Sequence, residues 1–167
     1  VFVGSIMASE TTAAATGAVG VVRRDPMAMR PFCGYNMGDY FAHWLEMGKK
    51  IPNAPKIFHV NWFRTDDQGN FIWPGYGENL RVLEWIMGRC FSEKEAVESP
   101  IGYLPRVEDI NLDGIDVAPE TLEKLLTVDK ELWRQEVTGI EEFYGKFGAH
   151  LPETLRQELN TLENNLK

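Results

Sequence analysis

The sequence predicts a mixed α/β fold that is rich in helices, and three observations support this expectation. Apolar residues recur at helical spacing in several segments, most clearly in 79–90 and near the C-terminus. One stretch, Lys56–Phe63, alternates between apolar and polar residues as a strand does. Glycine and proline clusters separate these segments. We expect the strands to join a sheet that residues outside this chain complete, so the segment taken alone would appear α+β.

The first half of the chain alternates strand and helix signals. Val19–Val22 predicts a short strand, and Met37–Met47 predicts a helix that ends near Gly48. This helix carries so many large apolar side chains that we expect burial on more than one of its faces. Lys56–Phe63 predicts a strand, which a loop at 66–69 connects to a returning strand, Asn70–Trp73.

The second half is mainly helical. A turn rich in proline and glycine leads into a helix over Asn79–Cys90, and Ser99–Pro105 is a short extended segment. The helix at 79–90 carries Leu80, Leu83, Ile86 and Met87 on one apolar face. Three helices form the tail, over Pro119–Val128, over Lys130–Phe147 and from Pro152 onward. The last carries a leucine stripe that normally packs on its own domain, with coiled-coil pairing as the alternative.

Composition excludes several classes of function. The 167 residues, 44% of them hydrophobic, are enough for one domain with a core. The net charge of −8 comes from the tail, and no basic stripe suits a nucleic acid. No apolar segment reaches membrane-spanning length. Two cysteines without CxxC spacing indicate a reducing compartment, and three dispersed histidines argue against a metal site within the chain.

Aromatic residues gather around the glycine-rich turn that precedes the 79–90 helix. Phe63, Phe71, Trp73 and Tyr76 supply ring faces, and Asn79 supplies an amide. Stacked rings hold a flat base at about 1–3 kcal/mol each, and an amide offers both donors and an acceptor to the base edge. The pattern therefore suits a purine, whereas the alternative is a hydrophobic core with a turn in it.

A run of small residues, MASETTAAATGAVG at 7–20, has almost no bulk to hold it in one conformation. Such a segment can change between open and ordered states, because its small side chains lose little entropy on ordering. The alternative is the start of a helix capped by Ser9 or Thr11.

Several long motifs occur in order and resemble the GTP-dependent phosphoenolpyruvate carboxykinases. They are RDPMAMRPFCGYNMGDYFAHWLEMG (Arg24–Gly48), PKIFHVNWFR (Pro55–Arg64), PGYGEN (Pro74–Asn79) and SPIGYLP (Ser99–Pro105). The resemblance implies the C-terminal part of the nucleotide-binding lobe of an enzyme that converts oxaloacetate and GTP into phosphoenolpyruvate, GDP and carbon dioxide. It also implies a cytoplasmic monomer that uses Mn²⁺ or Mg²⁺ bound outside this segment, with no nucleic-acid or membrane partner. The missing N-terminal part of the same enzyme would be its protein partner.

The resemblance assigns roles to individual residues. Residues 1–105 would belong to the nucleotide-binding lobe, and 106–167 would be a helical tail packed on it. A guanine pocket at about 61–80 would use Phe63, Phe71, Tyr76, Gly77, Glu78 and Asn79, with Glu78 acting through its backbone. The family usually has Phe where this chain has Tyr76. A mobile lid at about 8–20 would contain Ser9, Glu10, Thr11, Thr12, Ala13, Ala14, Ala15, Thr16 and Gly17.

The catalytic apparatus is missing from these residues. The sequence contains no GxxxxGKS or GxxxxGKT phosphate loop. Phosphoryl transfer needs metal and cationic groups around the moving phosphoryl, so this segment alone should be inactive. The alternative function is a non-catalytic nucleotide-binding or interaction module.

Overall fold

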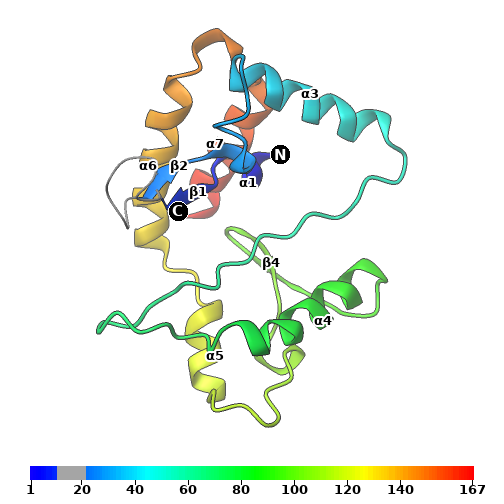
Figure 1. Ribbon diagram of the computed structural model, residues 1–167, viewed down its shortest axis with the longest axis vertical. Helices are drawn as coiled ribbons and strands as arrows, with labels where there is room; N and C mark the ends of the chain where they lie inside the picture. Colours follow the sequence, from blue (N-terminus) through cyan, green and yellow to red (C-terminus); the bar gives the residue numbers. More distant parts are fainter. Residues whose placement is uncertain (11–21) are drawn as a thin grey trace. The chain divides into compact units, whose positions relative to one another are not determined.

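A computed structural model describes residues 1–10 and 22–167 (Figure 1). It confirms a helix-rich mixed α/β chain whose described strands form two small antiparallel sheets. The chain divides into two compact units, Val1–Ala54 with Lys130–Lys167, and Pro55–Asp129. The first unit thus joins the last helices to the N-terminal residues, while the expected functional division into 1–105 and 106–167 stays a prediction.

The first unit has its core between two helices, α6 (Lys130–Gly145) and α7 (Glu153–Asn165). A short 3-10 helix, η4 (Gly148–His150), lies in their connection. The residues of this core are Val137, Ile140, Tyr144, Leu155, Leu159, Leu162 and Leu166, all at most 6% exposed. The leucine stripe of the last helix is therefore buried within its own unit, as the sequence predicts.

The N-terminal helix α1 (Phe2–Ser5) contacts this core through a buried hydrogen bond. The hydroxyls of Ser5 and Tyr144 lie 2.6 Å apart, and the Phe2 ring meets the Tyr144 ring edge-to-face at 6.4 Å. Ser5 also donates to the carbonyl of Phe2 at 2.7 Å. Both hydroxyls thereby have a partner, as buried polar groups require.

The buried hydroxyl of Tyr144 predicts a loss of stability in alkaline solution. Burial raises the pKa of Tyr144 from its ordinary 10.0 to about 12, against the opposing effect of the Ser5 hydrogen bond. The folded state holds the proton of Tyr144 more tightly than the unfolded state does. The contribution of Tyr144 to the free energy of unfolding is therefore complete below pH 10 and is lost as the pH rises toward 12. Urea unfolding should show the free energy of unfolding falling across this window. Tyr144→Phe should flatten that fall, and an equally steep fall in the variant would assign it to other groups.

Two short strands lie on either side of the residues that the structure does not describe. Strand β1 (Ala8–Glu10) pairs antiparallel with β2 (Val22–Arg24), with Ser9 opposite Arg23. The prediction of a strand at 19–22 is met only at Val22, since 19–21 lie outside the described residues. The alternative in which Ser9 caps a helix is wrong, because Ser9 lies within β1.

Helix α3 (Met37–Lys50) follows the 3-10 helix η1 (Pro26–Ala28) and covers the predicted segment. It begins where the Asn36 side chain accepts the Gly38 N–H at 2.8 Å. The expected burial on more than one face is wrong, since Gly38 and Phe41 are its buried residues and Trp44 is 42% exposed. Its second turn packs on the unit through Phe41, whose ring lies 5.5 Å from that of Phe147.

The second unit begins with a segment that the sequence predicts wrongly. Lys56–Phe63 forms no strand, because no neighbouring segment of the described chain offers it a ladder of hydrogen bonds. Lys56 instead donates to the carbonyls of Arg89 and Cys90 at 2.7 and 3.2 Å, where a cation suits the end of a helix. The predicted hairpin is reduced to one bridge, Thr65 to Phe71.

The remaining elements surround a second core. They are η2 (Tyr76–Glu78), α4 (Asn79–Cys90), the hairpin of β3 (Val97–Ser99) and β4 (Gly102–Leu104), η3 (Val107–Asp109), and α5 (Pro119–Leu126). Trp73, Trp85, Ile110 and Leu122 are buried together in this core. Of the four residues that the sequence places on one face of α4, Ile86 packs against this core, whereas Leu80, Leu83 and Met87 are 71%, 44% and 53% exposed. Val82 and Trp85 of α4 contribute to the same core.

Candidate functional site

Two of the predicted aromatic residues meet across the hairpin bridge of the second unit. The rings of Phe63 and Phe71 lie edge-to-face, 5.9 Å apart at 62°. The turn between them is closed by Asp66, whose carboxylate accepts the N–H groups of Gln68 and Asn70 at 2.9 and 2.8 Å. Both phenylalanines are largely exposed, at 70% and 64%. Their accessible faces can therefore stack on a planar ligand, which a core pair could not do.

The turn that follows places Tyr76 and Gly77 at the surface. Gly75 has a φ of +100°, a conformation that favours glycine, and it permits the sharp entry into η2. Tyr76 is 94% exposed. A Cβ added at Gly77 would meet nothing within 4 Å, so the space beside this backbone is open to a ligand.

Asn79 begins α4, and its side chain is held by the indole of Trp73, a member of the aromatic cluster. Trp73 is 5% exposed and donates from Nε1 to Oδ1 of Asn79 at 2.9 Å. This hydrogen bond uses the oxygen of the carboxamide and fixes the plane of the amide. The amide nitrogen is then the group that can donate to a ligand. Trp73 thus orients Asn79, a role that its inclusion in an aromatic cluster does not reveal.

The carboxylate of Glu78 is paired within its own unit. Its Oε2 accepts from Nε of Arg81 at 2.6 Å. The two other guanidinium nitrogens of Arg81 donate to the carbonyls of Asn111 and Asp113, both at 2.8 Å. In this arrangement the negative charge of Glu78 faces an arginine and leaves the backbone of the turn to meet a ligand.

The predicted lid falls mainly outside the described residues. Thr11, Thr12, Ala13, Ala14, Ala15, Thr16 and Gly17 lie there, while Ser9 and Glu10 belong to β1. Ser9 donates from Oγ to Oδ2 of Asp25 at 2.7 Å, and Asp25 is 6% exposed. Asp25 also donates its backbone N–H to the Met7 carbonyl at 2.9 Å.

Arg24 ties the same pair of strands to a long helix. Its Nη1 contacts Glu136 of α6 at 2.7 Å and the Ile6 carbonyl at 2.8 Å. The strands that flank the proposed lid are therefore anchored through Asp25 and Arg24. The run of small residues in the sequence does not predict the anchoring role of either residue.

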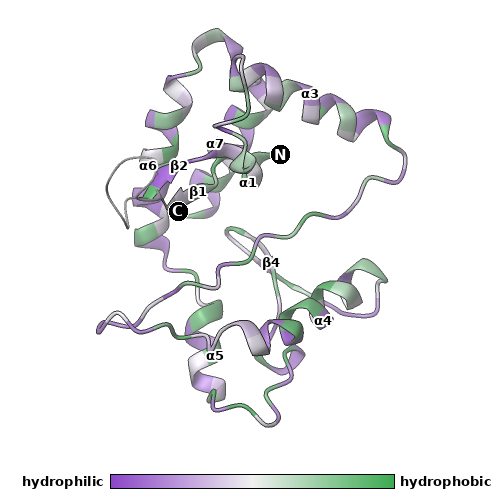
Figure 2. Cartoon of the chain, viewed as in Figure 1, coloured by the Kyte–Doolittle hydropathy of each residue, from purple (hydrophilic) through white to green (hydrophobic). Residues whose placement is uncertain are grey.

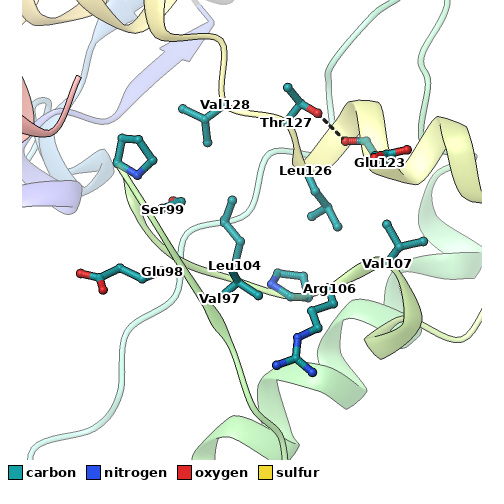
Figure 3. A pocket seen from close by; sticks show the side chains of 12 residues that line it. Val97, Glu98, Ser99, Leu104, Arg106, Val107, Glu123, Leu126, Thr127 and Val128 are labelled. Carbon is teal, nitrogen blue, oxygen red and sulfur yellow. Dashed lines mark hydrogen bonds between the residues drawn. The ribbon is translucent and has the colours of Figure 1, made fainter. Parts of the chain in front are cut away.

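A separate pocket of about 340 Å³ lies elsewhere in the second unit. It opens between the β3–β4 hairpin, η3 and α5, with Leu104, Val107 and Leu126 around it (Figure 3). None of the predicted guanine-site residues lines it. Because its lining is mostly apolar, with Arg106 as its only basic side chain, it does not suit a nucleotide.

Neither metal chemistry nor a membrane span is evident in the part of the chain that the structure describes. Over residues 1–10 and 22–167, His, Cys, Asp and Glu side chains form no group of three or more that could hold a metal ion. Within the same ranges, no helix is both long and apolar enough to cross a bilayer.

Comparison with known proteins connects these residues to one family. A family model described as the phosphoenolpyruvate carboxykinase C-terminal P-loop domain matches residues 1–165. Phosphoenolpyruvate carboxykinase (GTP) of Treponema pallidum (strain Nichols) is 52% identical over 167 residues, which cover 98% of this chain and 27% of the relative. The protein of the same name from Neocallimastix frontalis is 54% identical over 170 residues, covering 100% and 28%. The one from Thermoplasma volcanium is 51% identical over 158 residues, covering 95% and 26%.

Proposed function

The chain belongs to the GTP-dependent phosphoenolpyruvate carboxykinase family, and we propose that it supplies guanine recognition and the active-site lid of such an enzyme. It spans 27% of the length of the Treponema pallidum relative that it matches. The reaction of the whole enzyme would convert oxaloacetate and GTP into phosphoenolpyruvate, GDP and carbon dioxide, in the cytoplasm and as a monomer.

The geometry around Asn79 is the observation that carries this proposal. An exposed Phe63–Phe71 pair offers ring faces, and Asn79 lies in the same unit with its amide fixed by Trp73. Stacking is indifferent to the identity of a base, whereas a fixed amide donor distinguishes an acceptor from a donor on the base edge. The O6 acceptor of guanine suits such a donor, and the N6 amino group of adenine does not. Tyr76, Gly77 and the backbone of Glu78 would complete the site.

The phosphate and metal chemistry would lie outside these residues. The sequence has no phosphate-loop motif, although the matched family model is described as a P-loop domain. The phosphate loop, the ligands of Mn²⁺ or Mg²⁺ and the residues that bind oxaloacetate would come from another part of the parent enzyme. The 167-residue chain alone should therefore show no carboxykinase activity.

The proposal is tested in a chimera that carries this chain in place of the matched C-terminal segment of the Treponema pallidum relative. Carboxykinase activity of the chimera, with no activity of the 167-residue chain alone, is the expected result. An inactive but folded chimera would favour the alternative, a non-catalytic nucleotide-binding module.

Phe71→Ala should weaken GDP binding to the chimera about tenfold. This loss is in the lower part of the range of roughly 1–3 kcal/mol for a stacked base, because Phe63 remains to hold the ring. Calorimetric titration with GDP measures it, and oxaloacetate affinity should be nearly unchanged. Tyr103→Ala is the matched control, since Tyr103 is 66% exposed against 64% for Phe71. Equal losses in both variants would mean that neither ring contacts the base.

The proposed lid predicts an effect of Ala14→Gly on turnover. The anchoring of β1 and β2 by Asp25 and Arg24 supports a fixed base for a segment that would close over the active site of the parent enzyme. If ordering of the segment limits turnover, Ala14→Gly should slow it severalfold, because glycine loses about 0.5–1 kcal/mol more on ordering than alanine. GDP affinity should change little. Turnover equal to that of the unmodified chimera would mean that the segment is ordinary connecting structure.

A further inference from the structure

Helix α4 carries apolar residues on both of its faces. One face is covered within the second unit, where Trp85 is 5% exposed and Val82 and Ile86 pack around the same core. Apolar positions recur along the whole helix in the hydropathy view (Figure 2). A helix with a second apolar face, beyond the one that its own unit covers, is characteristic of an element that packs against a further part of a larger protein.

The other face is an exposed stripe. Leu80, Leu83 and Met87 of α4 and Phe91, which directly follows the helix, are 71%, 44%, 53% and 65% exposed and recur at helical spacing. These four residues are called the α4 stripe below. Cys90, also exposed, adjoins the stripe at its C-terminal end. An apolar stripe of this kind left in water is a mark of an interaction surface.

We propose that the α4 stripe is the docking face for the part of the parent polypeptide that lies outside this chain. The relatives supply the reason, since the matched segment is 27% of the Treponema pallidum protein and most of that protein remains to cover it. A second copy of the chain is a less favoured partner for the α4 stripe. The stripe is only about 17 Å long at 1.5 Å per residue, which is short for a stable helix pair.

Docking at the stripe also positions the candidate base site, an inference that rests on the proposed function. Leu80 directly follows Asn79, and the Asn79 side chain is bonded to Trp73 in the core beneath α4. A body packed on Leu80 and Leu83 therefore holds the N-terminal turn of α4 between two packed surfaces. The amide of Asn79 would then bind the base without a further loss of conformational freedom, because docking has already ordered it.

Cys90 is a natural reporter of this contact. In a Cys33→Ser background, a bulky maleimide should modify Cys90 rapidly in the 167-residue chain. In the chimera the same thiol should react at least tenfold more slowly, as measured by mass spectrometry of the peptide that contains Cys90. Equal rates in both proteins would overturn the proposal. Protection that already appears in the chain alone and rises with its concentration, together with a dimer in sedimentation, would assign the stripe to a second copy and overturn it as well.

A substitution at Leu83 separates docking from folding. Leu83→Glu should leave the melting temperature of the 167-residue chain within about 2 °C, because Leu83 is 44% exposed there. In the chimera it should restore rapid labelling of Cys90 and weaken GDP binding at least fivefold. Leu83→Met keeps an apolar side chain and should retain both protection and affinity. Unchanged labelling in Leu83→Glu would show that the stripe is not the docking face.

The two proposals fail in different ways. Loss of guanine preference with Cys90 still protected would reject the proposed function and keep the docking face. Guanine preference with Cys90 freely labelled would reject the docking face and keep the function.

Discussion

GDP should bind the chimera at least about 100-fold more tightly than ADP, and Asn79→Asp should remove this preference. Asn79 accepts a hydrogen bond from the Trp73 indole through Oδ1 and keeps its amide nitrogen as a donor. Guanine presents an acceptor at O6, where adenine presents an amino group. A site built to bond one of them rejects the other strongly, because a buried polar group is then left unpaired.

Asn79→Asp is more informative than a truncation. An aspartate has nearly the same shape and still accepts from Nε1 of Trp73, so the turn and the start of α4 should remain intact. It lacks the amide donor, and its carboxylate would repel O6 while accepting from the amino group of adenine. Calorimetric titrations with GDP and ADP should therefore show the preference lost or reversed, with an unchanged melting temperature. A preference that survives in this variant would mean that the backbone around Gly77 reads the base.

The helices are the part of the fold that the sequence predicts best. Helix α4 begins and ends at Asn79 and Cys90 as expected, since a proline- and glycine-rich turn precedes it. The tail helices α6 and α7 also follow their apolar periodicity, because both partners of their core lie within the chain. Local capping and a partner close in sequence are enough to determine such elements.

The errors occur where the partner is distant or outside the chain. Lys56–Phe63 alternates like a strand, yet a strand needs a neighbour, and the described chain provides none there. On α4 the periodicity places Leu80, Leu83 and Met87 on one apolar face but cannot tell whether that face is covered within the chain. Trp85 takes the core and Leu80 is left exposed. Periodicity thus reports that a face is apolar, whereas burial depends on which parts of the polypeptide are present.

The candidate site shows the same limit at the level of side chains. The residue types at Phe63, Phe71 and Asn79 are readable, and so is their order along the chain. The hydrogen bond from Trp73 to Asn79 depends on two rotamers set by the core, and no spacing rule contains it. Asp25 is a comparable case, since its contact with Ser9 joins residues 16 positions apart across the base of the proposed lid.

Gly38→Ala should destabilise the chain strongly, whereas Gly48→Ala in the same helix should stabilise it. A Cβ at Gly38 would lie 2.3 Å from the carbonyl oxygen of His150 and 2.7 Å from the carbonyl carbon of the same residue. Because these are backbone atoms, no side chain can rotate away, and the N-terminal turn of α3 must move. We expect a loss of about 3 kcal/mol, the upper part of the usual range for overpacking. The contacts of Asp39 with His150 at 2.9 Å and of Phe41 with Phe147 should weaken with it.

Gly48 is the matched control, because a Cβ there would meet nothing within 4 Å. Alanine is favoured over glycine inside a helix by about 0.8–1.0 kcal/mol, so this variant should gain a few degrees in melting temperature. Thermal unfolding of the two variants of the 167-residue chain measures both effects. Melting temperatures that shift in opposite directions in the two variants would show that the first turn of α3 packs closely against the backbone of η4. A stabilised Gly38→Ala variant would show that α3 is attached mainly by its side chains, with Phe41 as the principal contact.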